Sequence, residues 1–125
     1  KEDLGDFQEI LDVWCKEDGI NVPLTIDREQ PDWDGHVGFV PNYVKELSPD
    51  LKKTVLMCGP PIMIKFTLAG LKELGFSETQ VYTTMELRMK CGVGKCGRCN
   101  IGSKYVCKDG PVFRFDELGE LPDEY

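Results

Sequence analysis

Residues 54–75 read TVLMCGPPIMIKFTLAGLKELG. The first five residues form a short apolar run that is typical of a buried strand, and the Gly-Pro-Pro at 59–61 ends it. From residue 62 to residue 74 the apolar side chains follow a helical period, and Gly75 is a typical helix stop. A strand, a glycine turn and a helix in this order predict a βα unit.

The neighbouring segments continue this alternation. Residues 80–84 (QVYTT) predict a second strand, far enough along the chain to run parallel to the first. Residues 20–26 (INVPLTI) predict a strand that Pro23 moves toward a sheet edge, because proline lacks an N–H donor. Residues 41–47 predict a short helix that Pro41 opens.

An amphipathic helix is predicted between Asp6, as its N-cap, and Gly19, as its end. Its apolar stripe is suited to lie against a sheet and to place Trp14 in the core; the stripe comprises Phe7, Ile10, Leu11 and Trp14. Residues 1–84 therefore predict an α/β fold, the C-terminal part of a doubly wound, mostly parallel nucleotide-binding sheet.

The character of the chain changes near residue 85, where glycines, cysteines and short β-runs replace the helical periods. We therefore expect two domains, the end of a nucleotide-binding domain at 1–84 and a small module with an acidic tail at 85–125. No long apolar run suggests a membrane span, and the first residues do not resemble a signal peptide. These features predict a cytoplasmic protein, and the missing initial Met suggests a piece of a longer one.

Charge limits the partners of this 125-residue chain, because 15 Lys and Arg face 22 Asp and Glu, a net charge of −7. Such acidity argues against sequence-independent nucleic-acid binding. Residues 86–114 reverse the balance: Glu86 and Asp109 are the acids there, and the bases are Arg88, Lys90, Lys95, Arg98, Lys104, Lys108 and Arg114. This segment is either a solvated basic loop or a positive environment for an anionic group.

Four of the six cysteines lie in that basic segment: Cys91, Cys96, Cys99 and Cys107, spaced Cys-x4-Cys-x2-Cys-x7-Cys. Four thiolates in a glycine-rich loop suit a metal centre, because glycine lets the backbone wrap closely and present amide hydrogens to sulfur. The spacing favours a plant-type [2Fe-2S] cluster. Structural zinc, which more often uses two Cys-x2-Cys knuckles, and disulfides are the alternatives. No residue set suggests hydrolytic or phosphoryl chemistry, and no catalytic residue is predicted.

Three segments together carry a family resemblance: MCGPPIM at 57–63, MELRMKCGVGKCGRC at 85–99 and YVCKDGPVF at 105–113. They closely resemble the FAD- and NAD(P)-binding electron-transfer subunits related to ferredoxin-NADP reductase. The greatest likeness is to the gamma subunit of cytoplasmic NAD(P)-linked hydrogenases and sulfhydrogenases. The electron-transfer subunit of dihydroorotate dehydrogenase is a more distant likeness.

This resemblance implies an oxidoreductase subunit that moves electrons between NAD(P)H, FAD and a [2Fe-2S] cluster, and on to a hydrogenase-type partner subunit. It also implies that the chain is a C-terminal fragment, without the family's FAD-binding barrel and Gly-rich pyrophosphate turn. Alone it is expected to be catalytically incomplete, not to bind FAD and to bind NAD(P) poorly. The alternative is a zinc-stabilised structural or protein-interaction module without a redox role.

By the same resemblance, the Cys-Gly-Pro-Pro turn lies beside the nicotinamide, Met63 opens the next helix near it, and Glu86 lies close to the flavin and cluster. The expected cofactor-binding residues are Cys58, Gly59, Pro60, Pro61, Met63 and Glu86. For the turn, the structural alternative is that it simply ends a strand and starts a helix. Glu86 can equally be a surface glutamate. Thr25 and Asp27 are weaker candidates for a nucleotide contact.

Overall fold

The computed structural model describes residues 7–119, and the chain forms two compact units, Lys1–Phe39 and Val40–Tyr125. The first unit contains α1 (Phe7–Trp14), β1 (Thr25–Ile26) and β2 (His36–Val37). The second contains α2 (Val40–Leu47), β3 (Val55–Met57), α3 (Pro61–Leu74), η2 (Glu78–Gln80), β4 (Val81–Thr84), β5 (Asn100–Ile101), β6 (Lys104–Tyr105), α4 (Val106–Asp109), β7 (Val112–Arg114) and η3 (Phe115–Glu117).

The strands of the first unit are shorter than the sequence pattern predicts. The β-run at 20–26 is a strand only at Thr25–Ile26, which pairs in parallel with His36–Val37. Helix α1 forms where the apolar period predicts it, but the prediction that its stripe is buried is wrong, because Trp14 is 47% exposed. Two paired strands of two residues each offer too little apolar surface for a helix to cover. The proposed N-cap Asp6 lies outside the described residues.

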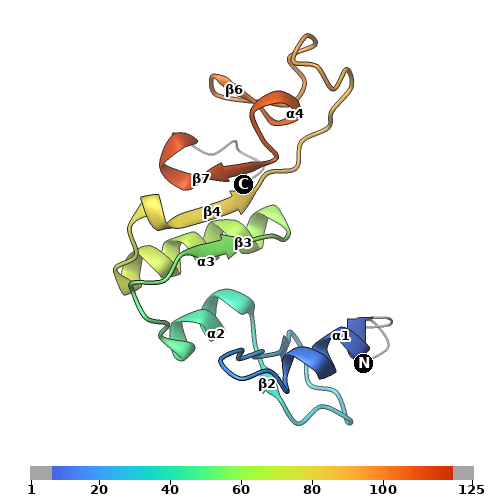
Figure 1. The fold of residues 1–125 in the computed structure, drawn as a ribbon, viewed down its shortest axis with the longest axis vertical. Helices are drawn as coiled ribbons and strands as arrows, with labels where there is room; N and C mark the ends of the chain where they lie inside the picture. Colours follow the sequence, from blue (N-terminus) through green and yellow to red (C-terminus); the bar gives the residue numbers. More distant parts are fainter. Residues whose placement is uncertain (1–6, 120–125) are drawn as a thin grey trace. The chain divides into compact units, whose positions relative to one another are not determined.

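The second unit is built on a three-stranded sheet in the order β3-β4-β7 (Figure 1). Strands β3 and β4 run parallel, with Met57 opposite Thr83, which confirms the predicted βα unit and its parallel neighbour. The third strand was not predicted as a sheet member: β7 pairs antiparallel with β4, with Phe113 opposite Thr83. A segment far along the chain thus completes the sheet of the βα unit.

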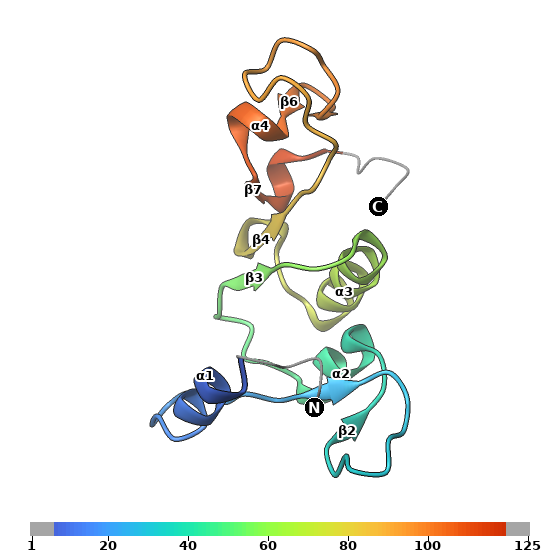
Figure 2. The ribbon, with the colours of Figure 1, turned by 90° about the vertical axis from the view of Figure 1, so that its right-hand side faces the viewer.

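Helix α3 lies against one face of this sheet (Figure 2). It starts at Pro61, whose missing N–H costs nothing in the first turn. It ends at Gly75, where φ is 103°, a left-handed conformation that favours glycine. The inward side chains form one core with Met57, Val81 and Phe113 of the strands; they are Ile64, Leu68 and Leu71. On β3, by contrast, Leu56 points away from this core and is 78% exposed.

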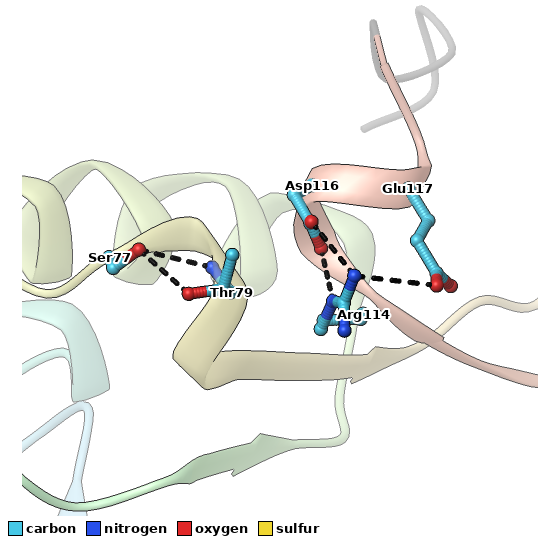
Figure 3. Close-up of polar contacts among 5 residues, drawn as sticks. All are labelled: Ser77, Thr79, Arg114, Asp116 and Glu117. Atoms are coloured by element: carbon cyan, nitrogen blue, oxygen red, sulfur yellow. Dashed lines mark hydrogen bonds and ion pairs between the residues drawn. The ribbon is translucent and has the colours of Figure 1, made fainter.

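Past β7, where the sequence predicts an acidic tail, the chain continues to pack against the core. Phe115, the first residue of the short helix η3, and Leu118, which follows this helix, are buried in the core. Arg114 holds this turn with a two-pronged contact to Asp116, Nε to Oδ1 at 2.6 Å and Nη2 to Oδ2 at 3.1 Å (Figure 3). The last part of the predicted tail, residues 120–125, lies outside the described residues.

The expected boundary near residue 85 lies within the second unit, between β4 and the cysteine loop. The division into domains at 1–84 and 85–125 stays a prediction. Among the helices within residues 7–119, none combines the length and apolar character that a membrane span requires.

Candidate metal centre

A short hairpin brings two of the four cysteines together. Strands β5 and β6 pair antiparallel, with Asn100 opposite Tyr105, and the backbone N–H of Val106 donates to the Cys99 carbonyl at 2.9 Å. Cys99 precedes the hairpin and Cys107 follows it on α4, so a gap of seven residues places them side by side. Cys99 is only 1% exposed, within the core of the second unit.

The other two cysteines lie in a loop shaped by glycine. Gly92, Gly94 and Gly97 all have φ of 71°, which other L-residues rarely adopt. The loop wraps backbone N–H groups around Cys91, whose Sγ accepts from the backbone N–H of Lys95 at 3.3 Å and of Cys96 at 3.4 Å. The loop projects beyond the sheet, beside β6 and α4 (Figures 1 and 2).

The loop and the hairpin are tied by one further contact. The backbone N–H of Gly94 donates to the Cys107 Sγ at 3.2 Å. The glycine pattern predicts that backbone N–H groups donate to cysteine sulfurs. It does not predict which N–H group donates to which sulfur, because that depends on the hairpin pairing.

These contacts shift the pKa values of Cys91 and Cys107 in opposite directions. Hydrogen bonds from the backbone N–H groups of Val93, Cys96 and Lys95, together with one from the Cys96 side chain, lower the pKa of Cys91 to about 6. A hydrogen bond with the Cys99 side chain, and then burial, raise the pKa of Cys107. The Cys96 side chain thus lies within hydrogen-bonding reach of Cys91, and the Cys99 side chain within reach of Cys107.

Two pairs of thiols fit a [2Fe-2S] cluster, which distributes four thiolates over two irons. Within residues 7–119, no group of three or more His, Cys, Asp or Glu side chains is placed to hold a metal ion. All six cysteines are free thiols, so the disulfide alternative does not describe this structure. The assignment of four individual ligands stays a prediction.

The predicted nucleotide-side residues gather at one edge of the sheet. Because β3 and β4 are parallel, the turn that starts at Cys58 and the segment that contains Glu86 leave the sheet at the same edge. Cys58, Pro60 and Glu86 are exposed there. Met63 folds back over the turn, since a Cβ at Gly59 would lie 2.2 Å from its Cε.

In the first unit, Thr25 has a structural role. Its hydroxyl donates to the Gly38 carbonyl at 2.8 Å and lies 2.8 Å from the His36 Nδ1. A hydroxyl has one hydrogen, so Thr25 has none left to donate to a nucleotide. Asp27 is exposed after the strand. A nucleotide contact by either residue stays a prediction.

Two family models match the chain. Residues 2–69 match the oxidoreductase NAD-binding domain, and residues 86–119 match the iron-sulfur cluster binding domain of dihydroorotate dehydrogenase B. The second match contains all four cysteines of the loop and hairpin.

Two curated relatives are similar to much of this chain. The sulfhydrogenase 1 subunit gamma of Pyrococcus furiosus is 37% identical over 110 residues, which cover 84% of this chain and 37% of that protein. The dihydroorotate dehydrogenase B electron transfer subunit of Clostridium perfringens is 45% identical over 83 residues, covering 63% of this chain and 31% of that protein. The chain thus spans less than two fifths of the length of these relatives.

A solved structure, described as an NADH-dependent reduced ferredoxin-NADP oxidoreductase, matches with a TM-score of 0.56 and 27% identity, over 87% of this chain and 42% of the other. The fold, the cysteine loop and these comparisons agree. The chain belongs to the oxidoreductase NAD-binding domain family and carries, after that domain, an iron-sulfur cluster binding domain of the dihydroorotate dehydrogenase B kind.

Proposed function

We propose that this chain is part of an electron-transfer subunit that passes electrons between NAD(P)H, FAD and a partner oxidoreductase through a [2Fe-2S] cluster. The observation that carries this proposal is that backbone N–H groups of the glycine loop point at the sulfurs of Cys91 and Cys107, with the side chains of Cys96 and Cys99 beside these two. The relatives are named as the gamma subunit of a sulfhydrogenase and the electron transfer subunit of a dihydroorotate dehydrogenase, which supports a role within a multi-subunit redox enzyme.

In this proposal Cys91 and Cys96 hold one iron, and Cys99 and Cys107 hold the other. When bound, a [2Fe-2S] cluster takes up and releases electrons one at a time, which complements the two-electron chemistry of a nicotinamide. The N–H groups directed at Cys91 stabilise negative charge on its sulfur.

The two pairs differ in their surroundings. Cys99 is buried in the core and excludes water from its side of the site. Cys96 is exposed and faces outward. This difference suits a site in which one side is secluded and the other meets a partner protein.

The nucleotide-binding part of the function is assigned to the turn after β3 and to the residues that follow β4. We place the nicotinamide beside Cys58, Gly59, Pro60, Pro61 and Met63, and Glu86 close to the flavin and the cluster. Support comes from the shared sheet edge at which the turn and Glu86 emerge, since ligands of open α/β sheets bind at the carboxyl ends of strands. FAD and the complete NAD(P) site belong to the full-length subunit. In this chain the nucleotide-binding domain ends at residue 84, and the [2Fe-2S] module begins at residue 85.

The partners implied are NAD(P)H and the other subunits of a redox complex, such as a hydrogenase-type enzyme, with neither nucleic acid nor a membrane among them. A cytoplasmic location suits a site made of reduced thiolates, because thiols stay reduced in that compartment.

The test is an anaerobic determination of iron, zinc and acid-labile sulfide, with a visible spectrum of the same sample. We expect about two irons and two sulfides per chain and absorption in the visible range. Cys96→Ser should abolish this absorption, whereas Cys15→Ser, which changes an exposed thiol of the first unit, should leave it intact. One zinc and no sulfide after reconstitution with iron and sulfide would instead support the zinc-stabilised module.

A further inference from the structure

The surface around the four cysteines carries unpaired positive charge. Five of its basic side chains are exposed and Lys104 is half-buried. Among the described residues, no ion pair involves any of the six, although pairs form elsewhere at Lys45, Lys72 and Arg114. This set, here called the basic rim, comprises Arg88, Lys90, Lys95, Arg98, Lys104 and Lys108.

Residues of the basic rim belong to the same segment whose backbone N–H groups surround the thiols. Lys95 contributes its backbone N–H to Cys91, and its side chain is exposed. The stem of Lys108 lies over Gly94, where a Cβ would meet the Lys108 Cδ at 3.3 Å. The N–H of that glycine reaches Cys107. Two of the positive side chains, Lys95 and Lys108, therefore lie at the loop that presents the sulfurs, and the other four are close to it along the chain.

Two apolar side chains stand among these charges. Val93 is 62% exposed and Met89 is 55% exposed, and both lie within the same loop segment as the basic rim. Exposed apolar groups surrounded by charged ones are typical of protein interaction sites. The exposed Cys96 lies in this segment, so a protein seated here approaches the cluster from its open side.

We infer that the basic rim, with Val93 and Met89, is a docking surface for an acidic protein that carries single electrons. This inference rests on the proposed function, since it gives the carrier a reason to dock at the cysteines. Charge complementarity selects the partner: the chain has a net charge of −7, yet residues 86–109 hold six bases against two acids.

The sign of the salt effect distinguishes a local docking surface from the overall charge. Two proteins of net negative charge repel each other, so added salt should strengthen their binding when net charge governs it. When the basic rim governs it, salt screens a local attraction and weakens the binding. The two cases predict opposite slopes.

The experiment measures binding to the reconstituted chain by surface plasmon resonance, at about 20 mM and about 300 mM NaCl. The probe is a small acidic ferredoxin, and cytochrome c serves as a basic carrier of opposite sign. The loop variant is Lys95→Glu with Arg98→Glu. The matched control is Lys52→Glu with Lys53→Glu, which changes the net charge equally at exposed positions before β3.

We expect salt to weaken ferredoxin binding, and the loop variant to weaken it by at least about tenfold at low salt, while the control changes it little. Cytochrome c should show the opposite response to the loop variant. Binding that strengthens with salt, or equal effects of the two double variants, would overturn the inference. Low-salt self-association in sedimentation, lost in the loop variant, would also overturn it by identifying a second copy as the occupant.

The outcome separates the two proposals. A chain that holds its cluster but shows no rim-dependent binding contradicts only the docking surface. A chain that never acquires iron and sulfide, yet binds ferredoxin with the expected salt and charge dependence, contradicts the proposed function and retains the docking surface. Visible spectra of all variants show whether a charge change has removed the cluster.

Discussion

Replacing single glycines of the cysteine loop should loosen the hold on the cluster without unfolding the protein. Gly92 and Gly97 both have φ of 71°, and a Cβ added at either would meet no atom within 4 Å. Alanine at these positions therefore introduces backbone strain and no steric clash. A left-handed conformation costs an L-residue about 1–2 kcal/mol.

That cost falls on the conformation that presents the thiols. At 1.4 kcal/mol for each factor of ten, the wrapped loop becomes about 5- to 30-fold less populated relative to opened forms. We therefore expect Gly92→Ala and Gly97→Ala to lose visible absorption about 5- to 30-fold faster than the parent chain in the presence of an iron chelator.

Gly119→Ala is the matched control, because Gly119 has φ of 64° and also has open space around its Cα. It carries the same kind of strain outside the loop and should release iron at the parental rate. Release at the parental rate by both loop variants would refute the reasoning, because the left-handed turns would then not determine the hold on the cluster. Equal acceleration in all three variants would show a general loss of stability instead.

Three further measurements test other parts of the structure. In the metal-free chain, alkylation of Cys91 should have a midpoint near pH 6, because amide donors, led by Val93, lower its pKa and the reactive thiolate is present above that pH; a midpoint near 9 in mass-spectrometric labelling would contradict this. Ile64→Ala should lower the free energy of unfolding by about 2–5 kcal/mol, because its side chain is fully buried, whereas the exposed Leu56→Ala should change it by less than about 0.5 kcal/mol in urea titrations. Asp116→Asn should lower the free energy of unfolding only slightly at neutral pH, since the pair with Arg114 is partly exposed and screened by solvent. The hydrogen bond from Arg114 lowers the Asp116 pKa, so this contribution is present above the ordinary value of 3.8 and lost as the pH falls through the folded pKa; a variant whose deficit persists at low pH would contradict the assignment.

Local patterns predicted much of the second unit. The helix at 61–74 and the parallel strands around it follow from an apolar run, a Gly-Pro-Pro break and a glycine stop, all of which act within a few residues. The cysteine spacing and its glycines also predicted a loop that directs backbone N–H groups at sulfur, because these contacts form within a few residues along the chain, whereas the four cysteines as metal ligands stay a prediction.

Features that depend on distant pairing could not be predicted in this way. The antiparallel pairing of β7 with β4 joins residues about thirty positions apart, and no period in either strand specifies its partner. Exposure of the α1 stripe was also missed, because periodicity identifies an apolar face but not whether a surface exists to cover it. The hydrogen bond from the Val106 N–H to the Cys99 carbonyl could not be predicted either, because it joins two backbone groups and no side-chain type marks it.

The pairing of β7 with β4 has a mechanical consequence for electron transfer. Residues on both sides of the cysteine segment belong to one hydrogen-bonded sheet, so the chain leaves this sheet at β4 and returns to it at β7. A hinge motion that carried the cysteines away from the βα unit would have to bend both closely paired ends of the segment and pull the buried Cys99, Ile101 and Val106 out of the core that they share with helix α3. We therefore expect a donor bound at the β3 and β4 edge to face the sulfurs across a nearly constant gap, with the rate of electron passage determined by that fixed spacing rather than by opening and closing.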